Sequence, residues 1–461
     1  MVFSSLAFLY GFLPLFVILY YATNVPNIRN FTLLLFSYFF YAWGEPFWVL
    51  LLAFSSVIDF ANGLLIERFR GTWKAKAILA SSIIVNFGML AAFKYGGFLY
   101  DNFNALIPLP FNRPVVDLPL GISFYTFQTV SYTIDVYRNT FRPQRNFTTF
   151  LMYVSMFPQL VAGPIVRYNE IESQLGHRHL NWDQIWSGVN RFAFGLFKKV
   201  FVANATGSLV VKYLANPSSD LTSPDAWIGL TLFSIQLYFD FSGYSDMAIG
   251  LGRMFGFEFP ENFKHPYAAI SVADFYRRWH ISLGKFFRDY VYIPLGGNRK
   301  MQDRNIFVVW ALTGLWHGAS WNFVIWGVYF GIFMILEKYA MSILKKTPRL
   351  LKHFYTLLLI IFSRSIFYYV DFEQLKRFWS KLFSGNYTIS QGMSIDLLNH
   401  VFLLSLAIIL CVPWDELFPR MESRVRPIYR WISLPLVLVM IAASTVLLVG
   451  DTYNPFIYFR F

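Results

Sequence analysis

The chain has 461 residues, of which 56% are hydrophobic, 20% aromatic and only 14% charged, and its formal net charge at pH 7 is +13. Apolar runs of about twenty residues, the length that spans a bilayer, recur from end to end, so the composition is that of a membrane protein. The positive charge is spread over short loops, which fits contact with anionic membrane lipid and argues against nucleic-acid binding. The lone cysteine, Cys411, forms no disulfide within the chain, and no Cys/His cluster suggests a metal site.

The apolar runs predict transmembrane helices. Only helices and closed barrels satisfy their backbone hydrogen bonds within lipid, and these runs are continuous, not alternating. We therefore expect an all-α fold, a polytopic transmembrane helical bundle that forms one domain over residues 1–461. The first run, 8–21, has no charged segment or cleavage site beside it, which indicates a retained span. The predicted spans are 5–22, 31–44, 47–66, 77–99, 119–137, 185–211, 226–252, 353–370, 396–412 and 433–450.

Two further segments are predicted to enter the membrane without a simple crossing. A re-entrant or short helical hairpin is expected at 305–317 and 321–338, with both of its ends on one side. The stretch 149–166 is a candidate re-entrant segment, because Gly163-Pro164 breaks a helix. Non-helical backbone at membrane depth lines a cavity or is buried in protein, so packing alone would also explain the break.

The loop charges give the chain an orientation. Lys and Arg gather in loops that the predicted spans place on one face, and by the positive-inside rule this face is cytoplasmic. The opposite loops are poor in basic residues, apart from 371–394, which fits an amphipathic helix on the outer interface. Both termini are then expected outside, with 453–461 as an extracytoplasmic tail. The basic loops lie at 68–76, 138–145, 277–304, 338–352 and 420–430.

His317 is the most informative single residue. It lies in the sequence Leu315-Trp316-His317-Gly318, between the two apolar runs of the predicted hairpin. An ionisable group at membrane depth is costly and usually faces a polar cavity, and an imidazole is suited to proton transfer near neutral pH. His317 is therefore a candidate general base. A buried histidine that only hydrogen-bonds a neighbour would show the same pattern.

A basic segment precedes the hairpin. Four cations there are predicted to bind the phosphates of an anionic cytoplasmic donor: Arg277, Arg278, Lys285 and Arg288. Guanidinium groups bind phosphate oxygens bidentately, and lysine adds a point charge. Contact with lipid headgroups is the alternative for any single one of them. His280 lies among these cations and is a second candidate catalytic residue, as a base, as a partner to the first histidine or as a structural donor.

Two aspartates, Asp240 and Asp246, lie in the predicted span 226–252. Carboxylates within a membrane span usually have a function, so both are expected to support the site. Asp240 is predicted either to orient an imidazole, as a carboxylate does in a hydrolase triad, or to form a salt bridge with Lys198 or Lys199.

Five stretches together carry a family resemblance: 118–125, 159–168, 238–247, 278–280 and 315–318. They resemble the membrane-bound O-acyltransferase family, in the bacterial branch that acts in alginate O-acetylation. The two histidine motifs and the Asp240 stretch, in this order, are the specific part. The resemblance implies that His317 is catalytic and that His280 belongs to a second histidine motif. It also implies that an acyl group moves from a cytoplasmic thioester, through the bundle, to a hydroxyl.

The C-terminal tail adds to this resemblance. Residues 456–461, with the sequence FIYFRF, resemble a tail of the same branch whose tyrosine is thought to carry the acyl group outward. Tyr458 is therefore the acyl-carrier candidate. A phenol has a pKa of about 10, far below that of an alkyl alcohol, so its ester is a good acyl donor. The alternative is an aromatic anchor at the membrane interface.

The resemblance implies a function. We expect a membrane O-acetyltransferase of the bacterial plasma (inner) membrane that passes acetyl from cytoplasmic acetyl-CoA to an extracytoplasmic polysaccharide, such as alginate or peptidoglycan. Acetyl-CoA is then a substrate, no bound cofactor is expected, and a separate extracytoplasmic SGNH-type O-acetyltransferase acetylates the glycan. The alternatives are a teichoic acid D-alanylation-type enzyme with an acyl carrier protein as donor, and a transporter or flippase that uses Asp240 and Lys198 as a relay.

Overall fold

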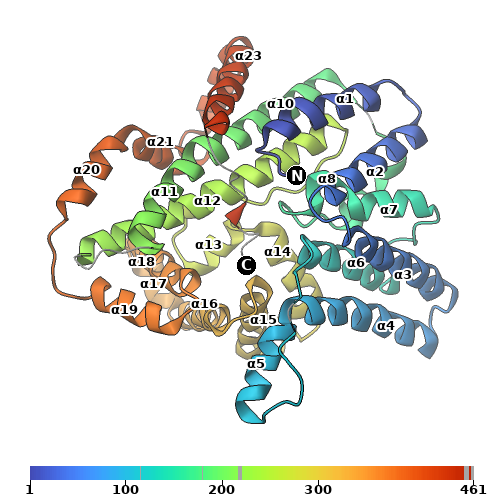
Figure 1. The fold of residues 1–461 in the computed structure, drawn as a ribbon, viewed down its shortest axis with the longest axis horizontal. Coiled ribbons are helices and arrows are strands. Elements are labelled where there is room, and N and C mark those ends of the chain that lie inside the picture. The colour runs from blue at the N-terminus through green and yellow to red at the C-terminus, as the bar shows by residue number, and fades with distance from the viewer. Residues whose placement is uncertain (115, 179, 216–220, 451–455, 458–461) are drawn as a thin grey trace. The chain divides into compact units, whose positions relative to one another are not determined.

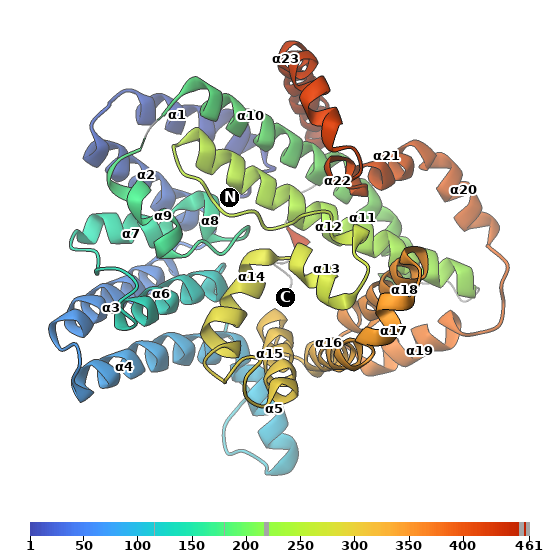
Figure 2. The same ribbon diagram turned by 180° about the vertical axis from the view of Figure 1, so that it is seen from behind.

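The computed structural model describes residues 1–114, 116–178, 180–215, 221–450 and 456–457, apart from the side chains of 420–430. Its regular elements are helices, which confirms the all-α fold predicted from the apolar runs (Figures 1 and 2). Phe263 and Trp279 form an isolated antiparallel bridge between irregular segments.

The chain divides into two compact units. Unit 1 comprises Met1–Phe192 with Ser245–Pro260, and unit 2 comprises Ala193–Tyr244 with Glu261–Phe461. Two boundaries fall within α10 (Trp182–Phe197) and α12 (Ser223–Met254), and the third lies between Pro260 and Glu261. The other helices of unit 1 are α1 (Leu13–Tyr21), α2 (Pro26–Ala42), α3 (Val49–Arg68), α4 (Trp73–Leu90), α5 (Gly96–Leu106), α6 (Ile122–Tyr137), α7 (Phe147–Ser155), α8 (Phe157–Leu160) and α9 (Tyr168–Gly176).

The remaining helices belong to unit 2. They are α11 (Ala205–Val210), α13 (Val272–Arg278), α14 (Ile281–Phe287), α15 (Gln302–His317), α16 (Trp321–Tyr339), α17 (Met341–Lys346), α18 (Arg349–Tyr368), α19 (Phe372–Leu382), α20 (Gln391–Asn399), α21 (Val401–Cys411), α22 (Trp414–Leu417) and α23 (Pro419–Val449). Short π or 3₁₀ turns join several helices: η1 (Phe8–Phe12), η2 (Ala91–Tyr95), η3 (Lys198–Asn204), η4 (Val211–Ala215), η5 (Pro266–Ala268) and η6 (Arg288–Tyr292).

Several helices have the length and composition of membrane spans. Among the described residues, five helices qualify, and a sixth span results if the pair α20 and α21, bent by 69°, is one crossing. Four predicted spans are neither among these five nor in the bent pair. The span 5–22 corresponds to the shorter apolar stretch Phe8–Tyr21, and 31–44 to the 17-residue helix α2. The span 119–137 becomes the 16-residue helix α6, and 226–252 lies within the 32-residue helix α12, which carries three aspartates. The five helices are Val49–Arg68, Trp73–Leu106, Trp182–Ala215, Arg349–Tyr368 and Trp431–Val449.

The helix break predicted at Gly163-Pro164 is present in unit 1. Helix α8 ends at Leu160, and Gly163 has a positive φ of 104° that favours glycine. A second glycine, Gly121, also has a positive φ, and a Cβ there would lie 2.7 Å from the carbonyl oxygen of Leu160. The stretches 118–125 and 159–168 therefore pack backbone against backbone.

Buried polar side chains join α3, α4 and α6 in unit 1. Ser82 and Asn86 of α4 both donate hydrogen bonds to the carboxylate of Asp59 in α3. Ser55 donates to Asn86, and Ser82 bonds Thr133 of α6 at 3.0 Å. In an apolar environment such interhelical hydrogen bonds hold helices together, since lipid offers the polar groups no other partner.

The amphipathic helix predicted in 371–394 is confirmed as α19, and most of its apolar face packs against unit 2. Leu375, Phe378 and Leu382 are buried in the core of unit 2, and Trp379 donates a hydrogen bond to Ser365 of α18 at 2.9 Å. The helix at the outer membrane interface stays a prediction, and the sequence pattern shows its apolar face without showing that a neighbouring helix covers it.

The predicted hairpin is α15 and α16, which lie side by side in both ribbon views (Figures 1 and 2). Two glycines allow this approach. A Cβ on Gly314 would lie 2.3 Å from the carbonyl oxygen of Phe323, and a Cβ on Gly327 would lie 2.3 Å from that of Trp310. Small residues at such a crossing let two backbones come together and gain van der Waals contact.

Replacing Gly314 or Gly327 with alanine is expected to destabilise the hairpin, because the added methyl group meets rigid helix backbone. Overpacking of this kind typically costs about 1–3 kcal/mol. The thermal unfolding midpoint of the purified protein should fall in both variants. Gly88→Ala is the control, since a Cβ at that exposed position meets no atom within 4 Å. Equal midpoints for all three variants would contradict the close approach.

Candidate active site

A cavity of about 500 Å³ in unit 2 brings together both predicted histidines and three of the four predicted donor-binding cations. Its walls come from α13, α14, η6, α15 and α16. The predicted site residues on its lining are His317, His280, Arg277, Lys285 and Arg288. The fold therefore joins two imidazoles and a cationic surface on one cavity.

His317 is the last residue of α15 and lies among aromatic rings. It is only 5% exposed. Trp326 of α16 meets the imidazole edge to face with 4.9 Å between ring centroids, and Phe367 of α18 does so at 5.4 Å. Residue 318, directly after His317, is glycine, and a Cβ there would lie 2.2 Å from the ring of Phe323, so the absence of a side chain lets this ring pack closely. Aromatic packing thus fixes the imidazole plane and limits its contact with water.

Asn262 holds His280 in one tautomer. The Asn262 side-chain oxygen accepts hydrogen bonds from the backbone N–H of Ser282 at 3.3 Å and from its hydroxyl at 2.9 Å. His280 Nδ1 lies 3.1 Å from the same oxygen and must donate to it, which leaves the lone pair on Nε2. Burial lowers the pKa of His280 to about 3, so the ring is neutral at physiological pH.

The backbone of His280 is also constrained. It has φ 46° and ψ 55°, a left-handed conformation that is uncommon for a residue with a side chain. The next residue, Ile281, donates its backbone N–H to the Asn262 carbonyl oxygen at 3.0 Å. On the ring side, Phe241 of α12 packs edge to face on the imidazole at 4.7 Å, and Trp316 does so at 5.7 Å. Asn262 therefore fixes both the backbone and the side chain of this histidine.

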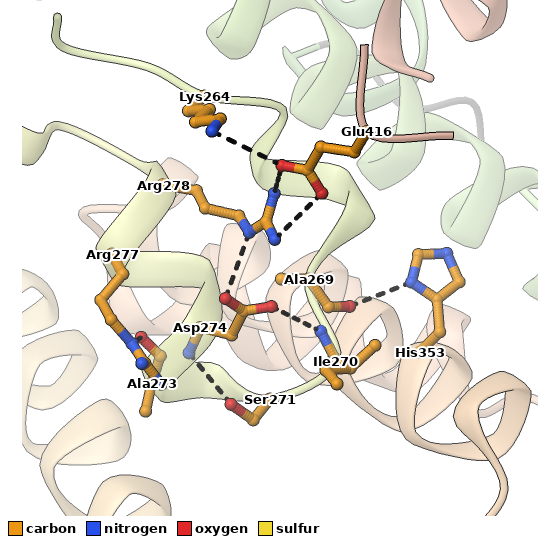
Figure 3. Close-up of polar contacts among 10 residues, drawn as sticks. All are labelled: Lys264, Ala269, Ile270, Ser271, Ala273, Asp274, Arg277, Arg278, His353 and Glu416. Carbon is orange, nitrogen blue, oxygen red and sulfur yellow. Dashed lines mark hydrogen bonds and ion pairs between the residues drawn. The ribbon is translucent and has the colours of Figure 1, made fainter. Parts of the chain in front are cut away.

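The two neighbouring arginines of α13 have different surroundings (Figure 3). Arg278 donates to Asp274 at 3.1 Å and to both carboxylate oxygens of Glu416, at 2.8 and 3.4 Å, so it ties α13 to α22. Arg277 donates to the carbonyl oxygen of Ala273 at 3.2 Å and lines the cavity. The two arginines look equivalent in the sequence, because Glu416 comes from a distant part of the chain.

A second cavity, of about 630 Å³, adjoins the first and shares Ala273, Arg277, Ile306 and Met334 with its lining. From the sequence, the lysines on its wall were predicted only to belong to a basic loop on the cytoplasmic face. No linear motif marks them, since they belong to α16, α17 and α18. The charged residues that line this second cavity are Asp274, Arg277, Arg278, Glu337, Lys338, Lys345 and Lys352.

The two predicted supporting aspartates are ion-paired. Asp240 Oδ1 lies 2.5 Å from Lys199 Nζ, and Oδ2 accepts a hydrogen bond from the backbone N–H of Ile457 at 2.8 Å. Of the two alternatives stated for Asp240, the structure shows the salt bridge. Asp246, in unit 1, pairs with Arg191 at 2.6 Å. Tyr458 lies outside the described residues.

The tautomer of His280 can be measured directly. In ¹⁵N-histidine-labelled protein, the Nδ1–H form should persist without protonation down to pH 5, because burial disfavours the charged ring. Asn262→Asp places a carboxylate beside Nδ1 and should raise the pKa of His280 by about 1–3 pH units. The ¹⁵N signal that disappears in His280→Gln identifies this histidine in the spectrum. An unchanged titration in Asn262→Asp would show that this contact is absent.

Comparison with known proteins places these features in a family. The model of MBOAT, the membrane-bound O-acyltransferase family, matches residues 139–375, which include both histidines. The chain is 42% identical over 418 residues to the probable alginate O-acetylase of Azotobacter vinelandii, covering 88% of this chain and 82% of that protein. It is 36% identical over 373 residues to the peptidoglycan O-acetyltransferase of Helicobacter pylori, covering 73% and 70%. Similarity to the teichoic acid D-alanyltransferase of Bacillus subtilis is 26% over 228 residues, covering 47% and 58%. The chain belongs to the membrane-bound O-acyltransferase family and is an O-acyltransferase.

Proposed function

We propose that this O-acyltransferase takes acetyl from cytoplasmic acetyl-CoA and passes it outward for O-acetylation of an extracytoplasmic polysaccharide, such as alginate or peptidoglycan. The observation that carries the proposal is the cavity that joins His317 and His280 to Arg277, Lys285 and Arg288. The named activities of the relatives support acetyl as the group and a polysaccharide as the final acceptor.

The donor enters through the cationic cavity. Acetyl-CoA carries a diphosphate and a further phosphate at one end and its thioester at the other. Arg277 lines both cavities, and Lys345 and Lys352 line the outer one, so cations are present where the phosphates would lie. Lys338 also lines the outer cavity, but it pairs with Asp303 at 2.6 Å. Charge-assisted hydrogen bonds to guanidinium are among the stronger polar contacts in proteins. The thioester then extends into the inner cavity, toward His317.

In the proposed reaction a hydroxyl oxygen forms a bond to the acetyl carbonyl carbon while the carbon–sulfur bond breaks. His317 accepts the hydroxyl proton as general base and returns it to the departing thiolate, so the products are an O-acetyl ester and free CoA. A base in position typically contributes about 10²–10⁴-fold in rate. His280 is neutral and fixed by Asn262, which suits it to a supporting role.

Tyr458 is the proposed first acceptor. One ring separates Phe456, two residues before it, from the site: Phe456 packs on Phe241 at 5.3 Å, and Phe241 packs on His280 at 4.7 Å. A phenol has a pKa of about 10, so its acetyl ester remains activated and can pass the group to a sugar hydroxyl. The second transfer is assigned to a separate extracytoplasmic SGNH-type O-acetyltransferase, in a bacterial plasma membrane with both termini of this chain outside.

The two alternatives have less support. The D-alanyltransferase match covers 47% of the chain, whereas the two O-acetylation relatives cover 88% and 73%, so acetyl-CoA is favoured over a carrier-protein donor. A transporter or flippase that uses Asp240 and Lys198 as a relay does not fit the membership in an acyltransferase family. In addition, Asp240 forms its ion pair with Lys199, whereas the relay was drawn with Lys198.

Labelled acetyl-CoA tests the proposal. The purified protein should transfer isotope-labelled acetyl to Tyr458, read by mass spectrometry of the C-terminal peptide. His317→Ala should lose this label and slow donor cleavage by about 10²–10⁴-fold, because it removes the general base. Tyr458→Phe should lose the label and the donor cleavage that needs this acceptor, and keep only hydrolysis, in which water takes the acetyl group. The control is His400→Ala, a histidine bonded to the Asp396 carbonyl oxygen.

Two outcomes would change the proposal. Donor cleavage without label on Tyr458 would retain the transferase and reject the tail as first acceptor. Failure to cleave acetyl-CoA even with the partner enzyme supplied would reject this donor in favour of an acyl carrier protein.

Arg277→Ala should raise the KM for acetyl-CoA about tenfold or more while leaving kcat nearly unchanged, because a hydrogen bond to a charged group is worth about 1.5–3 kcal/mol. Arg377→Ala is the matched control: its Nε donates to a carbonyl four residues earlier at 3.3 Å, as Arg277 does at 3.2 Å. Initial rates at varied acetyl-CoA concentrations give KM and kcat for each variant. Equal KM values in the two variants would remove Arg277 from the donor site.

A further inference from the structure

The last described residues of the chain are anchored in unit 2. The backbone N–H of Ile457 donates to Asp240 Oδ2 at 2.8 Å, and Ile457 packs against the hydrophobic core of the unit. Phe456 is only 2% exposed and lies between the rings of Phe241 and Tyr244, at 5.3 and 5.1 Å. A main-chain hydrogen bond and one buried ring therefore hold this segment against α12.

The carboxylate of Asp240, which accepts the hydrogen bond from the tail, also forms an ion pair with Lys199. Asp240 Oδ1 lies 2.5 Å from Lys199 Nζ, and the two side chains are 3% and 5% exposed. Gly243, one turn after Asp240, makes this pairing possible, because a Cβ there would lie 2.7 Å from the Gly195 carbonyl oxygen and 3.1 Å from the Lys199 nitrogen. The two backbones thus meet closely enough to bring lysine and aspartate together.

A buried ion pair is stable only when its remaining lone pairs also find donors. Lys199 engages one oxygen of Asp240, and the amide of Ile457 engages the other. Both carboxylate oxygens therefore have a defined partner, and neither partner is an imidazole. Asp240 therefore holds the tail and does not orient His280, because His280 Nδ1 is hydrogen-bonded to Asn262.

We propose that the Lys199–Asp240 pair is a docking site for the C-terminal tail, which it recognises through the backbone amide of residue 457 and the ring of Phe456. The role of the docked tail in acyl transfer rests on the proposed function; the docking itself does not. Asp240 and Lys199 are positioning residues, because they act on the acceptor through the tail that carries Tyr458. The main-chain hydrogen bond requires an N–H at position 457 and therefore excludes proline, which has none.

Hydrogen–deuterium exchange of the full-length protein in detergent tests the docking without any need for activity. The C-terminal peptide should be protected in the wild type. Ile457→Pro should speed exchange of its remaining amides at least about tenfold, whereas Ile457→Ala, which keeps the N–H donor, should leave them protected. Equal exchange in the proline and alanine variants would overturn the proposal. These substitutions lie in the tail, so they leave the folded unit intact.

Asp240→Asn tests the other side of the contact. It should expose the tail as Ile457→Pro does, whereas Asp396→Asn should not. Asp396 is the matched control because it also pairs with a lysine of unit 2, Lys212, at 2.6 Å. Protection of the tail that survives in a folded Asp240→Asn protein would overturn the proposal.

A third readout separates positioning from a general structural effect. Ile457→Pro should lose the acetyl label on Tyr458 while the protein still hydrolyses acetyl-CoA, and Ile457→Ala should keep both activities. Loss of label and hydrolysis together in the proline variant would contradict a positioning role. Absence of label on wild-type Tyr458 would reject the proposed relay, and the exchange experiment would still decide the docking.

Discussion

Glu337 joins the hairpin that carries His317 to the basic segment that lines the same cavity. Its carboxylate, at the end of α16, accepts hydrogen bonds from the backbone N–H groups of Val272 and Ala273, at 2.7 and 3.2 Å. These amides start α13, where unpaired N–H groups and the positive end of the helix dipole favour an anion. Glu337 is only 4% exposed, so these contacts are little screened by water. The spacing of the imidazoles and the cations depends on this junction.

The fold could be predicted as far as local sequence pattern determines it. Apolar runs predicted the helices, and the hairpin boundaries at 305–317 and 321–338 differ from α15 and α16 by three residues or fewer. The helix break at Gly163-Pro164 was also predicted, because both residues act on their own backbone. The covered face of α19 was not predicted, since its partner Ser365 lies on another helix.

In the site, too, features that depend on local sequence could be predicted and contacts between distant residues could not. The catalytic candidates His317 and His280 could be found because an ionisable group among apolar residues is conspicuous in the sequence. Their partners could not. Asn262 precedes His280 by 18 residues, and Glu416, which accepts from Arg278, is 138 residues away. The ion pair of Asp240 with Lys199 was one of several alternatives, because only the close approach of two backbones decides which lysine reaches it.

The docked tail and the second histidine share one aromatic ring. Phe241 packs on His280 at 4.7 Å and on Phe456 at 5.3 Å, and it follows Asp240 directly in α12. A close-packed interior transmits displacement, since a ring that moves toward a vacated space leaves its other neighbour less supported. Asn262 limits this movement at His280 by holding the imidazole and the adjacent backbone. Residues 240 and 241 therefore couple the position of the tail to the packing of the site: the aspartate binds the tail's backbone, and the phenylalanine separates the tail's ring from the imidazole.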